Sequence, residues 1–306
     1  MSSSRPELEQ APETHAGRIL AMATQGNLAA EAPGLTASAA LVGGGMFRLA
    51  TDAVALGRFD CGDDVGLVLA VATGNEKDEG SAYAATAAVV AVLEAFREPL
   101  ISEADLPPAL RRAMLEAHDA ILAVSREPLP KPLATTVGPR RSLRGVGSSL
   151  TAVAIRPSRL HGIHVGEGRA FLRRDSKTQK LTLEHTLANT AEFRKREGDW
   201  HDADEILEDM AESVVMKVLG LTEEPPQPDV FRCDLQPGDQ VFVANMLLST
   251  EFASEASDTT TGTAADGAPY REAARMLGHS MLEDLGRRMH QDRPLVTASV
   301  GVVSVC

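Results

Sequence analysis

The stretch from residue 145 to residue 182 constrains the fold more than any other part of the chain, because its apolar and polar residues alternate, turn and alternate again. One strand ends before a Pro157-Ser158 turn, a second covers residues 160–165, and a third covers residues 169–173 after a Gly-Glu-Gly turn. Period-two alternation, turn residues and β-branched content together predict a β-meander.

The meander contains three short motifs, which read GVGSS from residue 145, VGEGRAFL from residue 165 and LTLEH from residue 181. In order and spacing they resemble motifs of the metal-dependent protein phosphatases of type 2C, the PPM family. A fourth motif, LQPGD from residue 235, matches that family's Leu-x-Pro-Gly-Asp turn. The resemblance implies an α+β fold, a four-layer α-β-β-α sandwich in which two antiparallel sheets are flanked by helices.

The resemblance also implies one phosphatase-like domain over residues 15–306, preceded by a flexible arm at residues 1–14. Three segments are expected as insertions because of their composition: the small-residue segment 26–45, the proline-rich basic segment 126–144, and the polar segment 255–269. The predicted strands cover residues 19–24, 52–59, 65–72 and 296–305, and the predicted helices cover residues 81–96, 107–124, 204–219 and 270–290.

Charge and composition narrow the classes of partner. A net charge of -13 argues against nucleic acid and against anionic membrane surfaces, which both require clustered Lys and Arg. No apolar run is long enough to serve as a signal peptide or to span a bilayer. The three scattered cysteines predict neither a disulfide framework nor a zinc site. We therefore expect an intracellular protein, cytoplasmic by default, whose partners are other proteins.

Phosphatases of type 2C hold two Mn²⁺ or Mg²⁺ ions, and such hard cations require carboxylate ligands. The family's central Asp-Gly motif falls on Thr73 and Gly74, and its Ser-Asp-Gly-Leu motif places Asn245 at the ligand position. The closing Asp-Asn motif falls on Pro294 or two residues later, and neither register supplies an aspartate. The resemblance thus implies that three ligand positions lack a carboxylate.

Four residues remain as candidates for the original chemistry. Asp52 matches the family's early aspartate, and Glu167 stands at the turn position that serves a third, weaker metal in some members. Arg48 and Arg169 are candidates for phosphate binding, although Arg48 lies one residue closer to Asp52 than the family pattern requires. His161 and His164 lie three apart on a strand and are expected to face opposite sides, which disfavours a metal pair.

These observations predict a pseudophosphatase, a non-catalytic scaffold or regulatory subunit with no expected metal cofactor. Two alternatives remain: an active serine/threonine phosphatase whose Mn²⁺ or Mg²⁺ site is rebuilt from nearby carboxylates, and a module that binds phosphopeptides without hydrolysis. The candidate partner-binding residues are the single tryptophan in an acidic segment and three arginines of the basic segment: Trp200, Arg140, Arg141 and Arg144.

Overall fold

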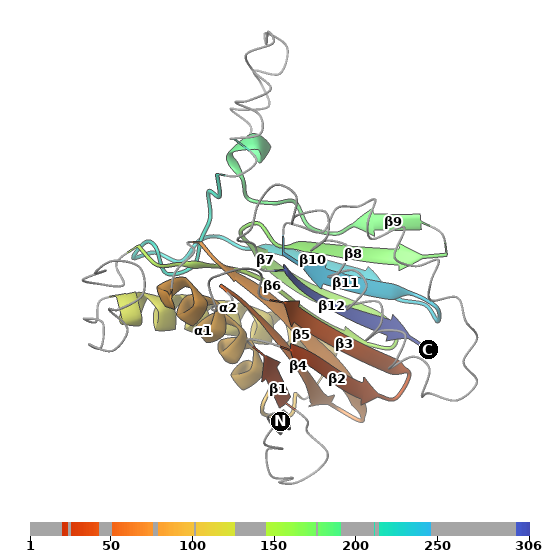
Figure 1. The fold of residues 1–306 in the computed structure, drawn as a ribbon. Helices are drawn as coiled ribbons and strands as arrows, with labels where there is room; N and C mark the ends of the chain where they lie inside the picture. Colours follow the sequence, from red (N-terminus) through yellow and green to blue (C-terminus); the bar gives the residue numbers. More distant parts are fainter. Residues whose placement is uncertain are drawn as a thin grey trace, which may run out of the picture.

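The computed structural model describes residues 20–23, 26–42, 51–75, 79–100, 102–125, 145–175, 177–190, 211, 214–245 and 298–306. These residues form two six-stranded antiparallel sheets, with two α-helices on the outer face of the first sheet (Figure 1). This arrangement confirms the predicted fold class. The expected helix over residues 270–290 lies outside the described residues.

The first sheet has the strand order β1-β4-β5-β6-β7-β10. Its central strands consist almost entirely of apolar residues, because helices cover one face of the sheet and the second sheet covers the other. The strand bounds are β1 Leu20–Ala23, β4 Asp52–Cys61, β5 Asp64–Gly74, β6 Ser148–Arg156, β7 Arg159–Val165 and β10 Asp229–Asp234.

The second sheet has the strand order β2-β3-β12-β11-β8-β9. The closing strand β12 lies between β3 and β11, so the end of the described chain is paired on both sides. The strand bounds are β2 Gly26–Ala32, β3 Leu35–Val42, β8 Arg169–Arg174, β9 Lys177–Lys180, β11 Gln240–Ala244 and β12 Ala298–Val305.

Helices α1 (Glu79–Ala95) and α2 (Leu106–Ser125) pack on each other and on the first sheet. Helix α1 is apolar or small around nearly its whole circumference, as a helix between a sheet and another helix must be. A single 3₁₀ turn, η1 (Glu103–Asp105), leads into α2, and the Ser102 amide donates to the Asp105 carboxylate at 2.8 Å. None of the described helices is both long and apolar enough to cross a membrane.

Side chains alternate between the two faces of each strand, which divides the core into two clusters. Val54 and Leu56 of β4 lie between the sheets, whereas Ala53 and Ala55 lie under the helices. Asp52 shares the parity of Val54 and Leu56, so its side chain points into the space between the sheets. The alternation therefore decides where the candidate site residues lie.

Two expectations from the sequence are wrong. Residues 26–42 are not a flexible insertion but a β-hairpin, because β3 pairs with β12 along its whole length and β2 pairs with β3. The described end of the predicted helix over residues 204–219 is extended, since Val215 bridges Thr186 and Leu219 bridges Ser148. The arm at residues 1–14 and the segments 126–144 and 255–269 lie outside the described residues.

Candidate site between the sheets

Polar side chains gather at one end of the space between the sheets, where the apolar inter-sheet core stops. Asp52 begins β4, and its register partner Thr73 stands near the end of β5. Thr73 is in turn opposite Ser149 at the start of β6. Asn245 follows the last residue of β11 in the other sheet. The two sheets thus bring three of the predicted site residues, Asp52, Thr73 and Asn245, to one end of the sandwich.

A hydrogen bond between Asn245 and Asp52 joins the two sheets at this end. The Asn245 side-chain amide donates from Nδ2 to Oδ2 of Asp52 at 2.9 Å. Both side chains are buried, with Asp52 1% and Asn245 4% exposed. The orientation of the amide follows from its partner, because turning it around would place its oxygen against a carboxylate oxygen. The second sheet therefore supplies an N–H donor to the Asp52 carboxylate of the first sheet.

Thr73 supplies no anionic oxygen to the site. Its hydroxyl oxygen is buried and has no hydrogen-bond partner within the described part of the chain. Its backbone carbonyl accepts hydrogen bonds from the hydroxyls of Ser148 at 3.1 Å and Ser149 at 3.3 Å. The two serines therefore fasten β6 to β5, as expected for structural residues.

Gly74 is required by packing on helix α1. A Cβ at this position would lie 2.5 Å from the Ser81 Cβ and from the Ser81 carbonyl oxygen. Asn75, which the sequence did not single out, holds the following loop: its side-chain oxygen accepts from the Gly147 amide at 2.7 Å, and its Nδ2 donates to the Gly145 carbonyl at 3.1 Å. The glycine-rich motif before β6 is thus fixed by an asparagine that follows β5.

The two histidines of β7 face opposite sides, as predicted. His161 lies on the helix side, with Nε2 3.1 Å from the Glu103 carboxylate. His164 lies on the inner side, where its ring stacks on that of His185 with centroids 4.8 Å apart. Its Nδ1 is 2.8 Å from the Thr151 hydroxyl, and burial lowers the pKa of His164 from 6.5 to about 3. The imidazole is therefore neutral at physiological pH.

His185 links the turn between β7 and β8 to the start of β10, a role that the LTLEH motif alone did not indicate. The Gly166 amide donates to its Nδ1 at 3.0 Å, so the proton of the neutral ring is on Nε2. Nε2 is 3.2 Å from the Asp229 carboxylate and accordingly donates to it. Burial and the nearby Lys217 ammonium lower the pKa of His185.

Glu167 is the middle residue of the Gly-Glu-Gly turn, and Arg169 follows that turn at the start of β8. Burial raises the pKa of the half-buried Glu167 carboxyl. Arg169 forms an ion pair with Glu184, which also binds Lys180. Ala170 belongs to the inter-sheet core, so its neighbour Arg169 points to the outer face of the second sheet. The structure thus places Arg169 away from Asp52, contrary to the phosphate-binding role that the resemblance implies.

The described donors do not fit a pair of hard divalent cations. Such a pair needs several carboxylates and a bridging ligand, and here Asp52 faces a hydroxyl and an amide N–H. In the part of the chain that the structure describes, no three His, Cys, Asp or Glu side chains form a group that would hold a metal. The remaining predicted site and partner residues lie outside the described residues: Arg48, Arg140, Arg141, Arg144, Trp200 and Pro294.

Comparison with known proteins assigns this arrangement to a family. The family model described as "Protein phosphatase 2C" matches residues 49–245, which include Asp52, Thr73 and Asn245. The search of curated proteins found no match.

Solved structures show the same fold at low sequence identity. The Mycobacterium tuberculosis serine/threonine phosphatase PstP/Ppp is 21% identical, with a TM-score of 0.61 over 89% of this chain and 98% of that one. The S. agalactiae serine/threonine phosphatase is 18% identical, with a TM-score of 0.64 over 89% and 100%. The catalytic domain of PstP in complex with two manganese ions is 18% identical, with a TM-score of 0.57 over 88% and 97%.

Proposed function

This chain belongs to the protein phosphatase 2C family, and from that premise we propose that it is a non-catalytic member, a pseudophosphatase that binds other proteins as a scaffold or regulatory subunit. The observation that carries the proposal is the hydrogen bond from Asn245 to Asp52 at 2.9 Å. In a metal-dependent phosphatase this carboxylate has to face cations. Here it faces an N–H donor and an uncharged threonine.

Electrostatics supports the absence of a metal cofactor. Two Mn²⁺ or Mg²⁺ ions bring four positive charges, and neutral Thr73 and Asn245 remove two of the negative charges that would balance them. An ion that approached Asp52 would also have to displace the Asn245 amide and break this buried hydrogen bond, at a cost of about 1–3 kcal/mol. Weak binding by the remaining groups would leave no bridging carboxylate to position an attacking water.

A direct test combines metal binding with hydrolysis. We expect no heat of Mn²⁺ or Mg²⁺ binding by calorimetry, no hydrolysis of p-nitrophenyl phosphate with either ion, and no ion-specific rise in melting temperature. A ligand that binds only the native state at a hundredfold excess over its Kd stabilises by about 2.7 kcal/mol, which a melting curve resolves readily. Metal-dependent hydrolysis would instead establish the active alternative, with a metal centre rebuilt from other carboxylates.

Restoring the family's carboxylates tests the residue assignments. Thr73→Asp alone is expected to create neither binding nor activity, because Asn245 and the closing-strand position still lack carboxylates. The triple variant Thr73→Asp, Asn245→Asp, Pro294→Asp is expected to regain Mn²⁺ binding. A matched double variant, Thr73→Asn and Pro294→Asn, keeps the native Asn245 and so places an amide instead of a carboxylate at all three positions, which controls for the change of shape. If the triple carboxylate variant binds no metal, the assignment of these three positions to the family's ligands is wrong.

The protein-binding part of the proposal rests on composition and on the family fold. The chain's net charge of -13 disfavours nucleic acid and anionic membranes as partners. The phosphopeptide alternative is less well supported, because Arg169 is one of the two arginines on which it depends. The Arg169 side chain is paired with Glu184 and points to the outer face of the second sheet, away from Asp52.

A further inference from the structure

Strand β10 forms an open edge of the first sheet. It pairs with β7 along its whole length, and it has no strand on its other side in the described part of the chain. Its side chains are accessible, since Val230 is 51% exposed and the Asp234 side chain 79%. Unpaired N–H and C=O groups along such an edge accept one class of partner, an extended chain. Prolines at 225, 226 and 228 limit the pairing region to β10 itself.

A cavity lies beside this edge on each face of the sheet. On the helix side, a cavity of about 290 Å³ is lined by Pro107 and Leu110 of α2 and by Val230 and Arg232 of β10. On the other side, a cavity of about 510 Å³ lies between β10 and residues 180–183. A strand added to β10 would direct alternate side chains into these two spaces. The helix-side cavity is mainly apolar and fits an aliphatic side chain.

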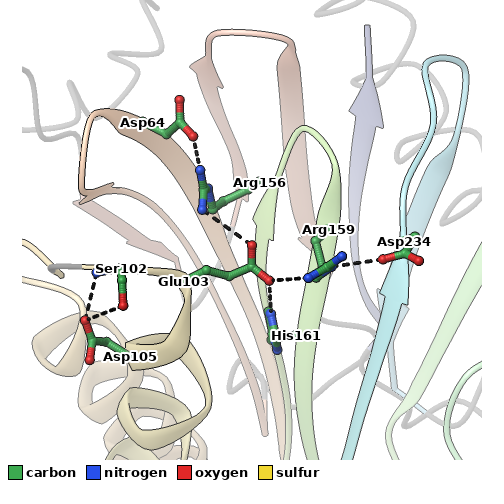
Figure 2. Close-up of polar contacts among 8 residues, drawn as sticks. All are labelled: Asp64, Ser102, Glu103, Asp105, Arg156, Arg159, His161 and Asp234. Carbon is green, nitrogen blue, oxygen red and sulfur yellow. Dashed lines mark hydrogen bonds and ion pairs between the residues drawn. The ribbon is translucent and has the colours of Figure 1, made fainter.

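The charges along β10 are balanced at all described positions except one. Asp234 receives a hydrogen bond from Arg159 at 2.9 Å, and Arg159 also donates to Glu103 at 2.9 Å (Figure 2). Asp229 is bound by His185 at 3.2 Å. Arg232 is exposed, and no carboxylate of the described residues forms an ion pair with it. The edge therefore offers one cation to a partner.

The cluster around Glu103 holds the end of this edge in place. The Glu103 carboxylate binds Arg156, Arg159 and His161, and Asp64 binds Arg156 from the β4-β5 turn (Figure 2). These contacts join η1, the β6-β7 turn and β10. Because the edge is anchored before a partner arrives, less conformational entropy is lost on binding.

We propose that an extended protein segment binds β10 as an added antiparallel strand, with an acidic side chain opposite Arg232 and an aliphatic side chain opposite Val230. The antiparallel direction follows the pairing of both sheets and is the more stable of the two ladders. In that direction the acidic residue precedes the aliphatic residue by two positions, and both lie on the helix side. The inference rests on the proposed protein-binding role and specifies its surface and its ligand.

The test uses a short peptide of this pattern, acetyl-Ser-Thr-Glu-Thr-Leu-Thr-Ser-amide, added at millimolar concentration to the ¹⁵N-labelled full chain. We expect amide shifts of residues 229–234 and of Leu110 to move with saturation. Replacing the peptide's Glu by Lys should weaken binding by about threefold, the size of a cross-strand charge pair. Exchanging the Glu and Leu positions should weaken it as well.

A charge reversal in the protein provides the decisive comparison. In Arg232→Glu the Lys peptide should bind better than the Glu peptide. The matched control is Lys177→Glu, which reverses an exposed cation on the edge strand β9 of the second sheet and should leave the preference unchanged. Absence of shifts in β10 with every peptide, shifts confined to another surface, or equal binding of the Glu and Lys peptides would each overturn the proposal.

This experiment separates the inference from the proposed function. An inactive protein that binds no metal and shows no response at β10 would refute the strand-addition site and leave the pseudophosphatase proposal standing. A protein that hydrolyses aryl phosphate and still binds the peptide would refute the pseudophosphatase proposal and leave the site standing.

Discussion

At the scale of single residues, Asn245 supplies a hydrogen bond to a buried carboxylate of the other sheet. Its amide satisfies one oxygen of a carboxylate that is 1% exposed and would otherwise be costly to bury. Thr73 contributes shape without charge. The hydrogen bond therefore stabilises the buried Asp52 carboxylate, and a second carboxylate introduced at position 245 should have a measurable cost.

Asn245→Asp is the corresponding prediction. In metal-free buffer at neutral pH, the variant should lose about 1–3 kcal/mol of unfolding free energy, because a donor to Asp52 becomes a second buried carboxylate. Urea unfolding measures the loss. The control Gln240→Glu adds the same charge at the other end of β11, the strand that Asn245 follows, and should change stability by less than about 0.5 kcal/mol. An Asn245→Asp protein as stable as the parent would show that the hydrogen bond contributes nothing.

A second prediction concerns the pH dependence of stability through His164. Its pKa in the folded protein is about 3, below the ordinary 6.5, so the unfolded chain binds a proton that the folded protein excludes. The contribution of the neutral His164 ring to the free energy of unfolding is therefore complete above pH 6.5. It decreases as the pH falls below that value, by about 1.4 kcal/mol per pH unit for one proton. His185, which stacks on His164 and also has a lowered pKa, adds to the same pH dependence. The carboxylates of Asp229 and Glu184 act in the opposite direction, because they raise the pKa of His164.

His164→Gln should therefore flatten the decline of unfolding free energy between pH of about 6.5 and 5. Thr151→Val serves as the control, because it removes the hydroxyl at 2.8 Å from His164 without removing the titrating ring. Thr151→Val should lower the free energy of unfolding at all pH values and leave its slope against pH unchanged. Identical slopes in the parent and in His164→Gln would mean that the ring is protonated in the folded protein.

The approach of Thr73 and Asn245 to Asp52 was predictable at this scale, since motif order places all three at strand ends. The direction of the Asn245 amide was not, because its partner is 193 residues away in sequence. The stacking of His185 on His164 was missed for a similar reason. No sequence pattern around either histidine indicates that the two rings stack on each other. The inward direction of His164 becomes clear only from the register of β6 and β7.

At the scale of elements, Gly301 of β12 sets how closely the two sheets approach. A Cβ at this position would lie 2.3 Å from Cδ1 of Leu69 in β5. Gly301→Ala is therefore expected to destabilise the fold by about 1–3 kcal/mol through overpacking. Combining it with Leu69→Ala should cost less than the sum of the two single changes, since each makes room for the other. Strict additivity in urea unfolding would contradict this contact.

The β2-β3 hairpin shows why element prediction failed in one place. Alanine is its commonest residue and has weak β-propensity, and nothing local identifies the two segments as strands. The hairpin forms because β12, from the far end of the chain, pairs with β3. The described end of the predicted helix over residues 204–219 failed for the opposite reason: its apolar spacing suits a helix, but Val215 and Leu219 pair with Thr186 and Ser148. By contrast, α1, α2 and the meander were predictable, because local pattern and tertiary packing agree there.

At the scale of the whole molecule, the two apolar clusters lie on either side of the first sheet, whereas the Arg232 side chain at its edge is exposed. Substitutions of exposed side chains should therefore alter the binding of a partner and leave the free energy of unfolding almost unchanged. This separation allows binding surfaces to be compared by capture from cell extract, with the melting temperature as an internal check on each variant.

The last prediction compares the sequence-derived surfaces with β10 in that assay. Interface energy concentrates in aromatic and arginine anchors, so Trp200→Ala, or Arg140→Ala, Arg141→Ala and Arg144→Ala combined, should weaken capture. Arg232→Glu should weaken it too if the captured partner uses the β10 edge. Each variant should keep its unfolding free energy within about 0.5 kcal/mol of the parent. Undiminished capture by all of them would place the partner elsewhere, and deletion of residues 1–14 would then be the variant that abolishes it.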